Sequence, residues 1–243
     1  MTANADTLHH ELRRIARRLS RDLRSVRPGP GVSCVYDPLD YAWEAHASYL
    51  ALARSKPRAM LLGMNPGPFG MVQTGVPFGE VAAAREFLGI DRGVRTPRHQ
   101  HPKRPVLGFA CTRSEVSGHR FWGLMREEFG TAARFFRAGF VWNWCPLAFA
   151  APSGANVTPD KLPAGARATI DAACDRALAR VVSVIAPRML IGVGAFASAC
   201  AARALGDRLP VHTVLHPSPA SPAANRGWNR AARAQLRACG FLA

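Results

Sequence analysis

The stretch GMNPGPFGMVQTGVPFG, residues 63–79, directly follows the apolar run of residues 59–62 and combines five glycines with three prolines. Glycine lets a backbone approach a ligand closely, and proline fixes φ without supplying an N–H. We therefore expect a rigid binding loop after a buried strand, not a flexible linker. The loop contains no Ser, Cys, His or acidic residue, so chemistry within it must proceed without a strong nucleophile or base.

Apolar runs and helical periodicity extend outward from this loop. Strands are expected at residues 58–63, 138–143, 188–193 and 211–215, and helices at 7–25, 41–54, 76–88, from 114 onward, 165–186, 195–205 and up to 238. Residues 91–105, which are basic, and residues 152–165 show no periodicity and are expected to be surface loops. Strands that alternate with helices imply an α/β protein with a parallel sheet covered on both faces.

Three polar residues stand where predicted strands end. Asn65 follows the first strand, Asn143 ends the second, and His216 follows the fourth. In parallel sheets, ligands bind beyond the carboxyl ends of the strands. We therefore expect these three side chains to converge on one site.

The charge of the chain favours a nucleic-acid partner. Its 243 residues carry 32 Lys and Arg against 16 Asp and Glu, a formal net charge of +16. A solvated, arginine-rich surface is the alternative. The six cysteines show no C-x-x-C spacing, so we expect no metal and no cofactor. The N-terminus resembles no signal peptide, and no apolar run is long enough to cross a bilayer, so no membrane association is expected.

Residues 1–31 are predicted to form a basic N-terminal helix and linker, and residues 32–243 the main domain. The helix has an apolar face at 3.6-residue spacing, and arginines fill its other faces. Such a helix can pack on the domain, follow phosphates or touch a membrane surface. Packing on the domain is the favoured interpretation.

One motif indicates a different class of protein. Residues 192–197 fit G-x-G-x-x-A between a strand and a helix, as in dinucleotide-binding folds. The motif lies late in the chain, and no acidic residue ends the following strand. Close packing of a helix on a strand is the favoured explanation, and a nucleotide-dependent enzyme is the alternative.

Six runs together match one family: YDPLDYAWEAH (36–46), GMNPGPFGMVQTGVPFGEV (63–81), SEVSGHRFWG (114–123), NWCPL (143–147), LAFAAPSGANVTP (147–159) and HPSPASPAANRGW (216–228). They resemble the single-strand-selective monofunctional uracil-DNA glycosylase family, within the uracil-DNA glycosylase superfamily. The resemblance implies a three-layer α/β/α fold with a short four-stranded parallel sheet. It also implies a base-excision-repair enzyme that hydrolyses the N-glycosidic bond of uracil and 5-substituted uracils, such as 5-hydroxymethyluracil, in single- and double-stranded DNA. The products would be an abasic site and free uracil.

The resemblance assigns catalytic roles to Asn65, which would position water, and to His216, which would stabilise charge on O2 of the departing base. Asn143 would read the base, because an amide offers a donor and an acceptor that match uracil and mismatch cytosine. The other residues that the resemblance assigns are Met64 and Gly67 near C5 of the base, Phe78 as the stacking ring, and Ser114, Ser117, Pro217, Ser218, Pro219, Ala220, Ser221 and Asn225 as DNA contacts. Since Asn65 cannot take a proton at neutral pH, we predict a dissociative mechanism with weakly activated water.

Ala220 departs from the pattern of vertebrate members, which carry a bulky arginine there. Alanine would fill the gap left by a flipped base poorly, so we expect a preference for single strands or mismatches over intact duplex. The alternatives are a glycosylase acting mainly on another deaminated base, such as xanthine, and a DNA-binding protein without catalysis. A monomer is expected, in the cytoplasm or nucleoid of a bacterium or the nucleus of a eukaryote.

Overall fold

The computed structural model describes residues 2–243, with side chains from residue 5 onward, and places a four-stranded parallel sheet at its centre. In the order β3-β2-β6-β7, the strands are β3 (Gly139–Asn143), β2 (Ala59–Gly63), β6 (Met189–Val193) and β7 (Val211–Val214). The register pairs Gly63 with Asn143, so the polar residues after β2 and at the end of β3 emerge side by side. The predicted fold class and the four predicted strands are confirmed.

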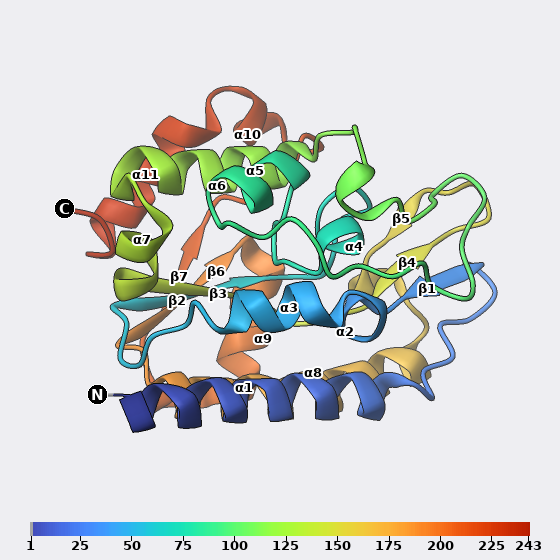
Figure 1. The fold of residues 1–243 in the computed structure, drawn as a ribbon, viewed down its shortest axis with the longest axis horizontal. Coiled ribbons are helices and arrows are strands. Elements are labelled where there is room, and N and C mark those ends of the chain that lie inside the picture. Colours follow the sequence, from blue (N-terminus) through green and yellow to red (C-terminus); the bar gives the residue numbers. More distant parts are fainter. Residues whose placement is uncertain (1) are drawn as a thin grey trace.

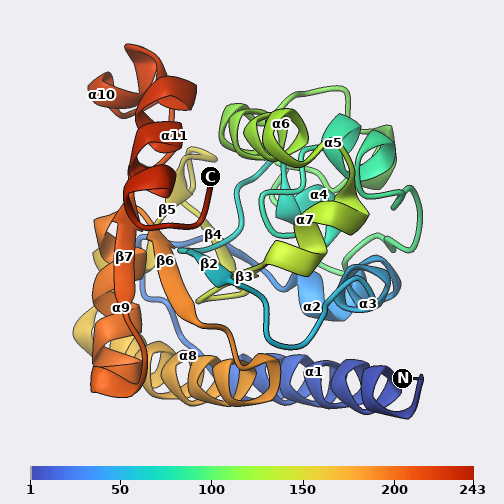
Figure 2. The ribbon, with the colours of Figure 1, turned by 90° about the vertical axis from the view of Figure 1, so that its left-hand side faces the viewer.

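Helices cover both faces of this sheet (Figures 1 and 2). The helices α8 (Ala164–Ile185), α9 (Ala195–Leu205) and α1 (Thr2–Leu23) lie on one face, and α6 (Val116–Phe129), α7 (Ala132–Ala138) and α11 (Trp228–Ala238) lie on the other. Right-handed crossovers between parallel strands require this division. At the edge strand β3, the Tyr49 hydroxyl donates to the Val141 carbonyl at 2.7 Å and accepts from its N–H at 3.2 Å. Tyr49 lies on α3 (Trp43–Leu50), which therefore covers that edge.

The basic helix α1 packs lengthwise against α8 (Figure 2). Its leucines and isoleucine are buried in the main hydrophobic core, and its arginines face outward. The favoured packing interpretation thus agrees with the observed contacts, whereas the domain boundary at residue 31 stays a prediction. Of the helices within residues 2–243, none is both long and apolar enough to cross a membrane.

A second, antiparallel sheet was not predicted. It consists of β1 (Cys34–Tyr36), β4 (Ala148–Ala150) and β5 (Asn156–Val157). These strands are two or three residues long, too short to show a recognisable alternation of polar and apolar residues. The remaining elements are α2 (Pro38–Tyr41), α4 (Met71–Thr74), α5 (Val81–Glu86), α10 (Pro222–Asn225) and three 3-10 turns, Gly108–Ala110, Pro159–Lys161 and Gly206–Arg208.

One local prediction is wrong, and another holds only in part. The helix expected at 76–88 begins only at Val81, because Phe78 has a positive φ of 52° and the side chain of Glu80 caps α5 by accepting from the Ala83 N–H. The segment 91–105 is a loop and exposed over most of its length, as expected, but it is not solvated throughout. His101 is buried, and its ring nitrogens contact the Pro152 carbonyl and the Lys103 N–H.

Candidate functional site

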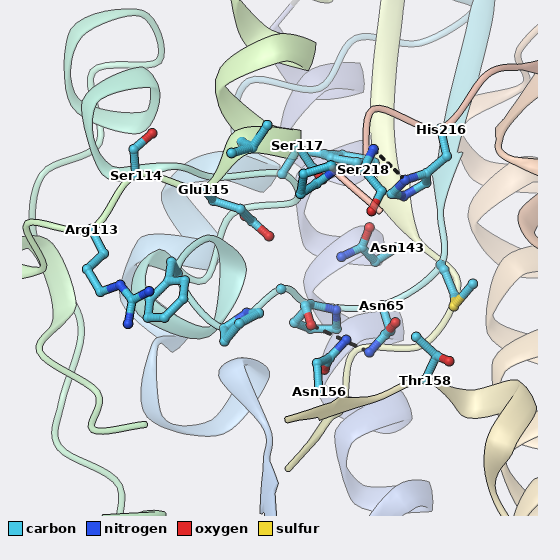
Figure 3. Close-up of a pocket in the computed structure, with 18 residues that line it drawn as sticks. Asn65, Arg113, Ser114, Glu115, Ser117, Asn143, Asn156, Thr158, His216 and Ser218 are labelled. Carbon is cyan, nitrogen blue, oxygen red and sulfur yellow. Dashed lines mark hydrogen bonds between the residues drawn. The ribbon is translucent and has the colours of Figure 1, made fainter. Parts of the chain in front are cut away.

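A cavity of about 630 Å³ opens at the carboxyl ends of β2, β3 and β7 (Figure 3). Ten of the predicted site residues line it: Met64, Asn65, Gly67, Phe78, Ser114, Ser117, Asn143, His216, Ser218 and Pro219. The other four, Pro217, Ala220, Ser221 and Asn225, belong to the segment that continues from His216 and are not part of the lining. The sheet therefore brings the polar strand ends together as expected, while the roles of the individual residues stay predictions.

Phe78 forms one wall of the cavity. Its ring stacks on Phe121 with centroids 4.6 Å apart and planes 15° apart, so the opposite ring face is the one available to a ligand. A left-handed backbone is unfavourable for a bulky residue, and the neighbouring contacts hold it. Trp122 donates to the Pro77 carbonyl at 3.1 Å, and Gly118 lets α6 approach so closely that a Cβ there would overlap the Phe78 carbonyl oxygen. The ring is thus rigidly placed before any ligand arrives.

Two amides lie at adjacent strand ends. Asn143 is buried at the end of β3, and its Nδ2 lies 3.2 Å from the sulfur of Met71. Asn65 donates from Nδ2 to the Leu147 carbonyl at 3.3 Å. Because its nitrogen is held by the backbone, the Oδ1 of Asn65 is left as an acceptor for a water molecule.

His216 is held as a neutral donor. Its Nδ1 accepts a hydrogen bond from the Ser218 N–H at 3.0 Å (Figure 3). Burial lowers the pKa of His216 from 6.5 to about 4. A neutral imidazole that accepts at Nδ1 carries its proton on Nε2, so His216 offers an uncharged N–H donor to the cavity.

Side chains of α6 and α11 hold the residues on either side of His216 in place. Arg120 donates to the Pro217 carbonyl at 3.0 Å and to Asn225 Oδ1 at 3.1 Å. The Trp228 indole donates to the Leu215 carbonyl at 2.7 Å. Asn225 also donates to the Pro219 carbonyl at 2.7 Å, so this predicted DNA contact already has internal partners. Ala220 is exposed at the tip of the same segment.

Eight lining residues were not among the predicted site residues: Pro66, Pro68, Phe69, Arg113, Glu115, Val116, Asn156 and Thr158. Glu115 matters most, since it places an acid beside a loop that contains none. It lies within the run SEVSGHRFWG, but nothing in the sequence shows that its side chain faces the cavity. The Arg113 guanidinium lies 4.0 Å from the centre of the Phe69 ring and adds a cation at the cavity wall.

The glycines of residues 192–197 have structural explanations. A Cβ on Gly192 would meet the backbone of Ser198, so this glycine permits close packing of α9 on β6. Gly194 has a φ of 95° and lies under the His216 side chain, with its hypothetical Cβ 3.1 Å from that of His216. The motif therefore supports the histidine, in agreement with the packing interpretation.

Comparison with known proteins identifies relatives over nearly the whole chain. Residues 51–237 match the model of the uracil DNA glycosylase superfamily. The chain is 50% identical over 229 residues to a single-strand selective monofunctional uracil DNA glycosylase of Bos taurus and to one of Rattus norvegicus, covering 93% of this chain and 84% and 82% of theirs. The crystal structure of wild-type SMUG2 from Pedobacter heparinus superposes with a TM-score of 0.65 at 15% identity, covering 93% of this chain and 96% of that one.

Proposed function

Because the chain belongs to the uracil DNA glycosylase superfamily, we propose that it is a monofunctional glycosylase that hydrolyses the N-glycosidic bond of uracil in DNA. The observation that carries this proposal is the convergence of four residues from separate segments on one cavity. These residues are Asn65, Phe78, Asn143 and His216. Asn65 offers an acceptor for water and Phe78 a ring face on which a base can stack. Asn143 offers an amide that can pair with the edge of the base, and His216 offers an N–H donor for a developing oxyanion.

Recognition begins with a base flipped out of the stack, which costs a few kcal/mol. The free face of Phe78 supplies a stack worth about 1–3 kcal/mol, comparable to that cost. Asn143 then distinguishes the base by pairing one donor and one acceptor with O4 and N3–H of uracil. Cytosine presents the opposite pattern at these atoms and is rejected.

The bond between C1′ and N1 breaks with its electron pair moving into the base. Negative charge develops on O2, where the Nε2–H of His216 stabilises it, and one such donor is typically worth about 2.7–4 kcal/mol. The sugar becomes oxocarbenium-like, and the water held by Asn65 Oδ1 adds its oxygen to C1′. The proton released by this water neutralises the departing base through solvent, leaving uracil and an abasic site.

None of the described residues lining the cavity is a lysine. A Schiff base with the sugar is therefore not formed from this wall, and the reaction ends at the abasic site. The enzyme acts as a monomer on single-stranded and duplex DNA, with a preference for single strands because Ala220 fills a vacated base position poorly. It works where the DNA is, in the bacterial cytoplasm and nucleoid or the eukaryotic nucleus.

The test uses single-stranded and duplex oligonucleotides bearing uracil or xanthine, with alkaline cleavage at abasic sites. We expect uracil release by the wild type and a loss of at least about a hundredfold in His216→Ala, the usual cost of an oxyanion-hole donor. Asn65→Ala should likewise lose activity while still binding DNA. His10→Ala, an exposed histidine on α1 outside the cavity, is the matched control. Release of xanthine but not uracil would replace this substrate assignment, and full activity of either cavity variant would remove the role given to that residue.

A further inference from the structure

A shallow groove of about 270 Å³ lies on the outward face of α1. Four of the residues that line it are arginines, Arg13, Arg14, Arg17 and Arg21. They recur three or four residues apart, so they share one face of the helix, and all four are exposed. The apolar residues of α1 lie on the opposite face and are buried in the core. Packing of α1 on the domain therefore leaves its basic face uncovered.

Most of the positive charge on this face has no acidic partner. Arg14 pairs with Glu11 at 2.6 Å. In contrast, Arg13, Arg17 and Arg21 form no ion pair within the part of the chain that the structure describes. Three cations on one helix face are thus available to an anionic partner.

The arrangement of these three arginines fits a phosphate backbone. A helix rises about 1.5 Å per residue, so Arg13 and Arg21 stand about 12 Å apart along α1. One strand of duplex DNA carries a phosphate about every 3.4 Å along the axis, which gives three or four phosphates over that length. Between them, the Arg17 guanidinium lies 3.7 Å from the centre of the Trp43 ring. Such stacking fixes the plane of a guanidinium and leaves its N–H groups to donate at the edge.

The basic face lies away from the cavity. None of the described residues that line the cavity belongs to α1 or to its neighbours α8 and α3. Figures 1 and 2 both show α1 along one edge of the molecule and α10, which follows the His216 segment, at the opposite edge. DNA held at the cavity through that segment would not also lie along α1. A partner on α1 is therefore a second stretch of polyanion.

We propose that Arg13, Arg17 and Arg21 form a second DNA-binding surface, which holds duplex DNA by its phosphates while the cavity is occupied. Contacts to phosphates carry no sequence information, so this binding does not require uracil. It would keep the protein on DNA between encounters with damaged bases. The inference goes beyond the proposed function, and only the choice of DNA as the polyanion rests on that function.

An anionic membrane fits the same face less well. Helices that lie on a membrane bury an apolar face among the lipids. In α1 that face is already used, because Leu12, Ile15 and Leu19 are buried within the protein. A duplex requires no apolar contact, since the release of counterions from its phosphates drives binding. DNA is therefore the partner that the contacts of α1 favour.

Fluorescence anisotropy with a short labelled duplex that contains no uracil tests this proposal. An excess of an unlabelled single-stranded oligonucleotide with an abasic site is added first, so that the cavity is occupied. The wild type should still bind the duplex, with an affinity that falls steeply as salt rises. The triple variant Arg13→Gln, Arg17→Gln, Arg21→Gln should bind at least about tenfold more weakly. The slope of log K against log salt should also become shallower by about 2.7, which is about 0.9 for each lost phosphate contact.

The matched control removes the same charge from other surfaces. Arg134, Arg137 and Arg208 are exposed, and none of them forms an ion pair with another described residue. They precede β3 and β7, the two edge strands of the parallel sheet, so they are not neighbours of one another across the sheet. Changing all three to glutamine should leave the duplex affinity and the salt slope close to those of the wild type.

The outcomes separate this surface from its alternatives and from the proposed function. Duplex binding by the triple variant within about twofold of wild type, or an equal loss in the control variant, would refute the proposal. So would unchanged duplex binding together with lost binding to vesicles of anionic phospholipid, which would assign the face to a membrane. Should the triple variant fail to fold, the double variant Arg13→Gln, Arg21→Gln keeps Arg17 on Trp43 and should make the slope shallower by about 1.8. A wild type that binds the duplex but releases no uracil would overturn the proposed function and leave this surface in place.

Discussion

Lowering the pH from about 8 to about 5 should leave the contribution of His216 to catalysis nearly unchanged. The Ser218 N–H occupies Nδ1 at 3.0 Å, and burial lowers the pKa of the ring from 6.5 to about 4. Protonation would have to replace this accepted hydrogen bond with two N–H groups facing each other. The structure therefore predicts catalysis by a neutral histidine throughout this range.

The size of the effect follows from the two pKa values. With a pKa of about 4, roughly nine-tenths of the His216 side chains are still neutral at about pH 5. With the ordinary pKa of 6.5, only about 3% would be neutral at that pH. A mechanism that needs the neutral ring would differ by about thirtyfold in rate between these two cases at about pH 5.

The assay is the single-turnover rate of uracil release from a single-stranded oligonucleotide. Burial raises the pKa of Glu115, which also lines the cavity, to about 7, so the profile is measured in Glu115→Gln, where that second titration is absent. NMR titration of the His216 ring provides the pKa and the tautomer independently, and circular dichroism confirms that the protein stays folded. A rate that falls about tenfold per pH unit below pH 6.5, together with a ring pKa near 6.5, would refute the reasoning.

Three further changes probe the walls of the cavity. Phe78→Ala should lower kcat/KM by an amount that corresponds to the loss of one base stack, about 1–3 kcal/mol. An unchanged kcat/KM would show that the base does not stack on this ring. Gly118→Ala should destabilise the protein by about 1–3 kcal/mol and reduce activity, because the new Cβ overlaps the Phe78 carbonyl. In the control Gly123→Ala, on the same helix, the new Cβ enters open space, so thermal unfolding should show a neutral or stabilising effect. Ala220→Arg should raise activity on U:A duplex relative to single strands, and an unchanged ratio would contradict the assigned role of this position.

Much of the architecture follows from local sequence properties. Three apolar runs became β2, β3 and β6, since a strand buried on both faces must be apolar throughout its length, whereas the edge strand β7 is partly exposed and includes His212 and Thr213. The helix predicted at 195–205 has those bounds in the structure. Asn65, Asn143 and His216 could be predicted to meet, because the carboxyl ends of parallel strands lie at one edge of the sheet.

The elements that were predicted wrongly or not at all depend on contacts between distant segments. The segment 76–88 has a helical composition, yet Phe78 adopts a left-handed conformation. Its surroundings come from about forty residues away, where Trp122 donates to the carbonyl of the neighbouring Pro77 and Gly118 lets α6 approach the Phe78 carbonyl. The strands β1, β4 and β5 are stabilised by pairing between distant segments, which periodicity within a short run cannot report.

The positions of the strands along the chain, the edge of the sheet that carries the site and the residue types available there thus follow from local sequence. The protonation and orientation of those residues depend on how distant segments pack. The tautomer of His216 depends on the Ser218 N–H, and the place of Glu115 depends on the absence of side chains at Gly67 and Gly70. The residue type alone does not fix the protonation state or the orientation of a side chain. Burial and nearby backbone groups fix them, and both arise from the packing of segments far apart in sequence.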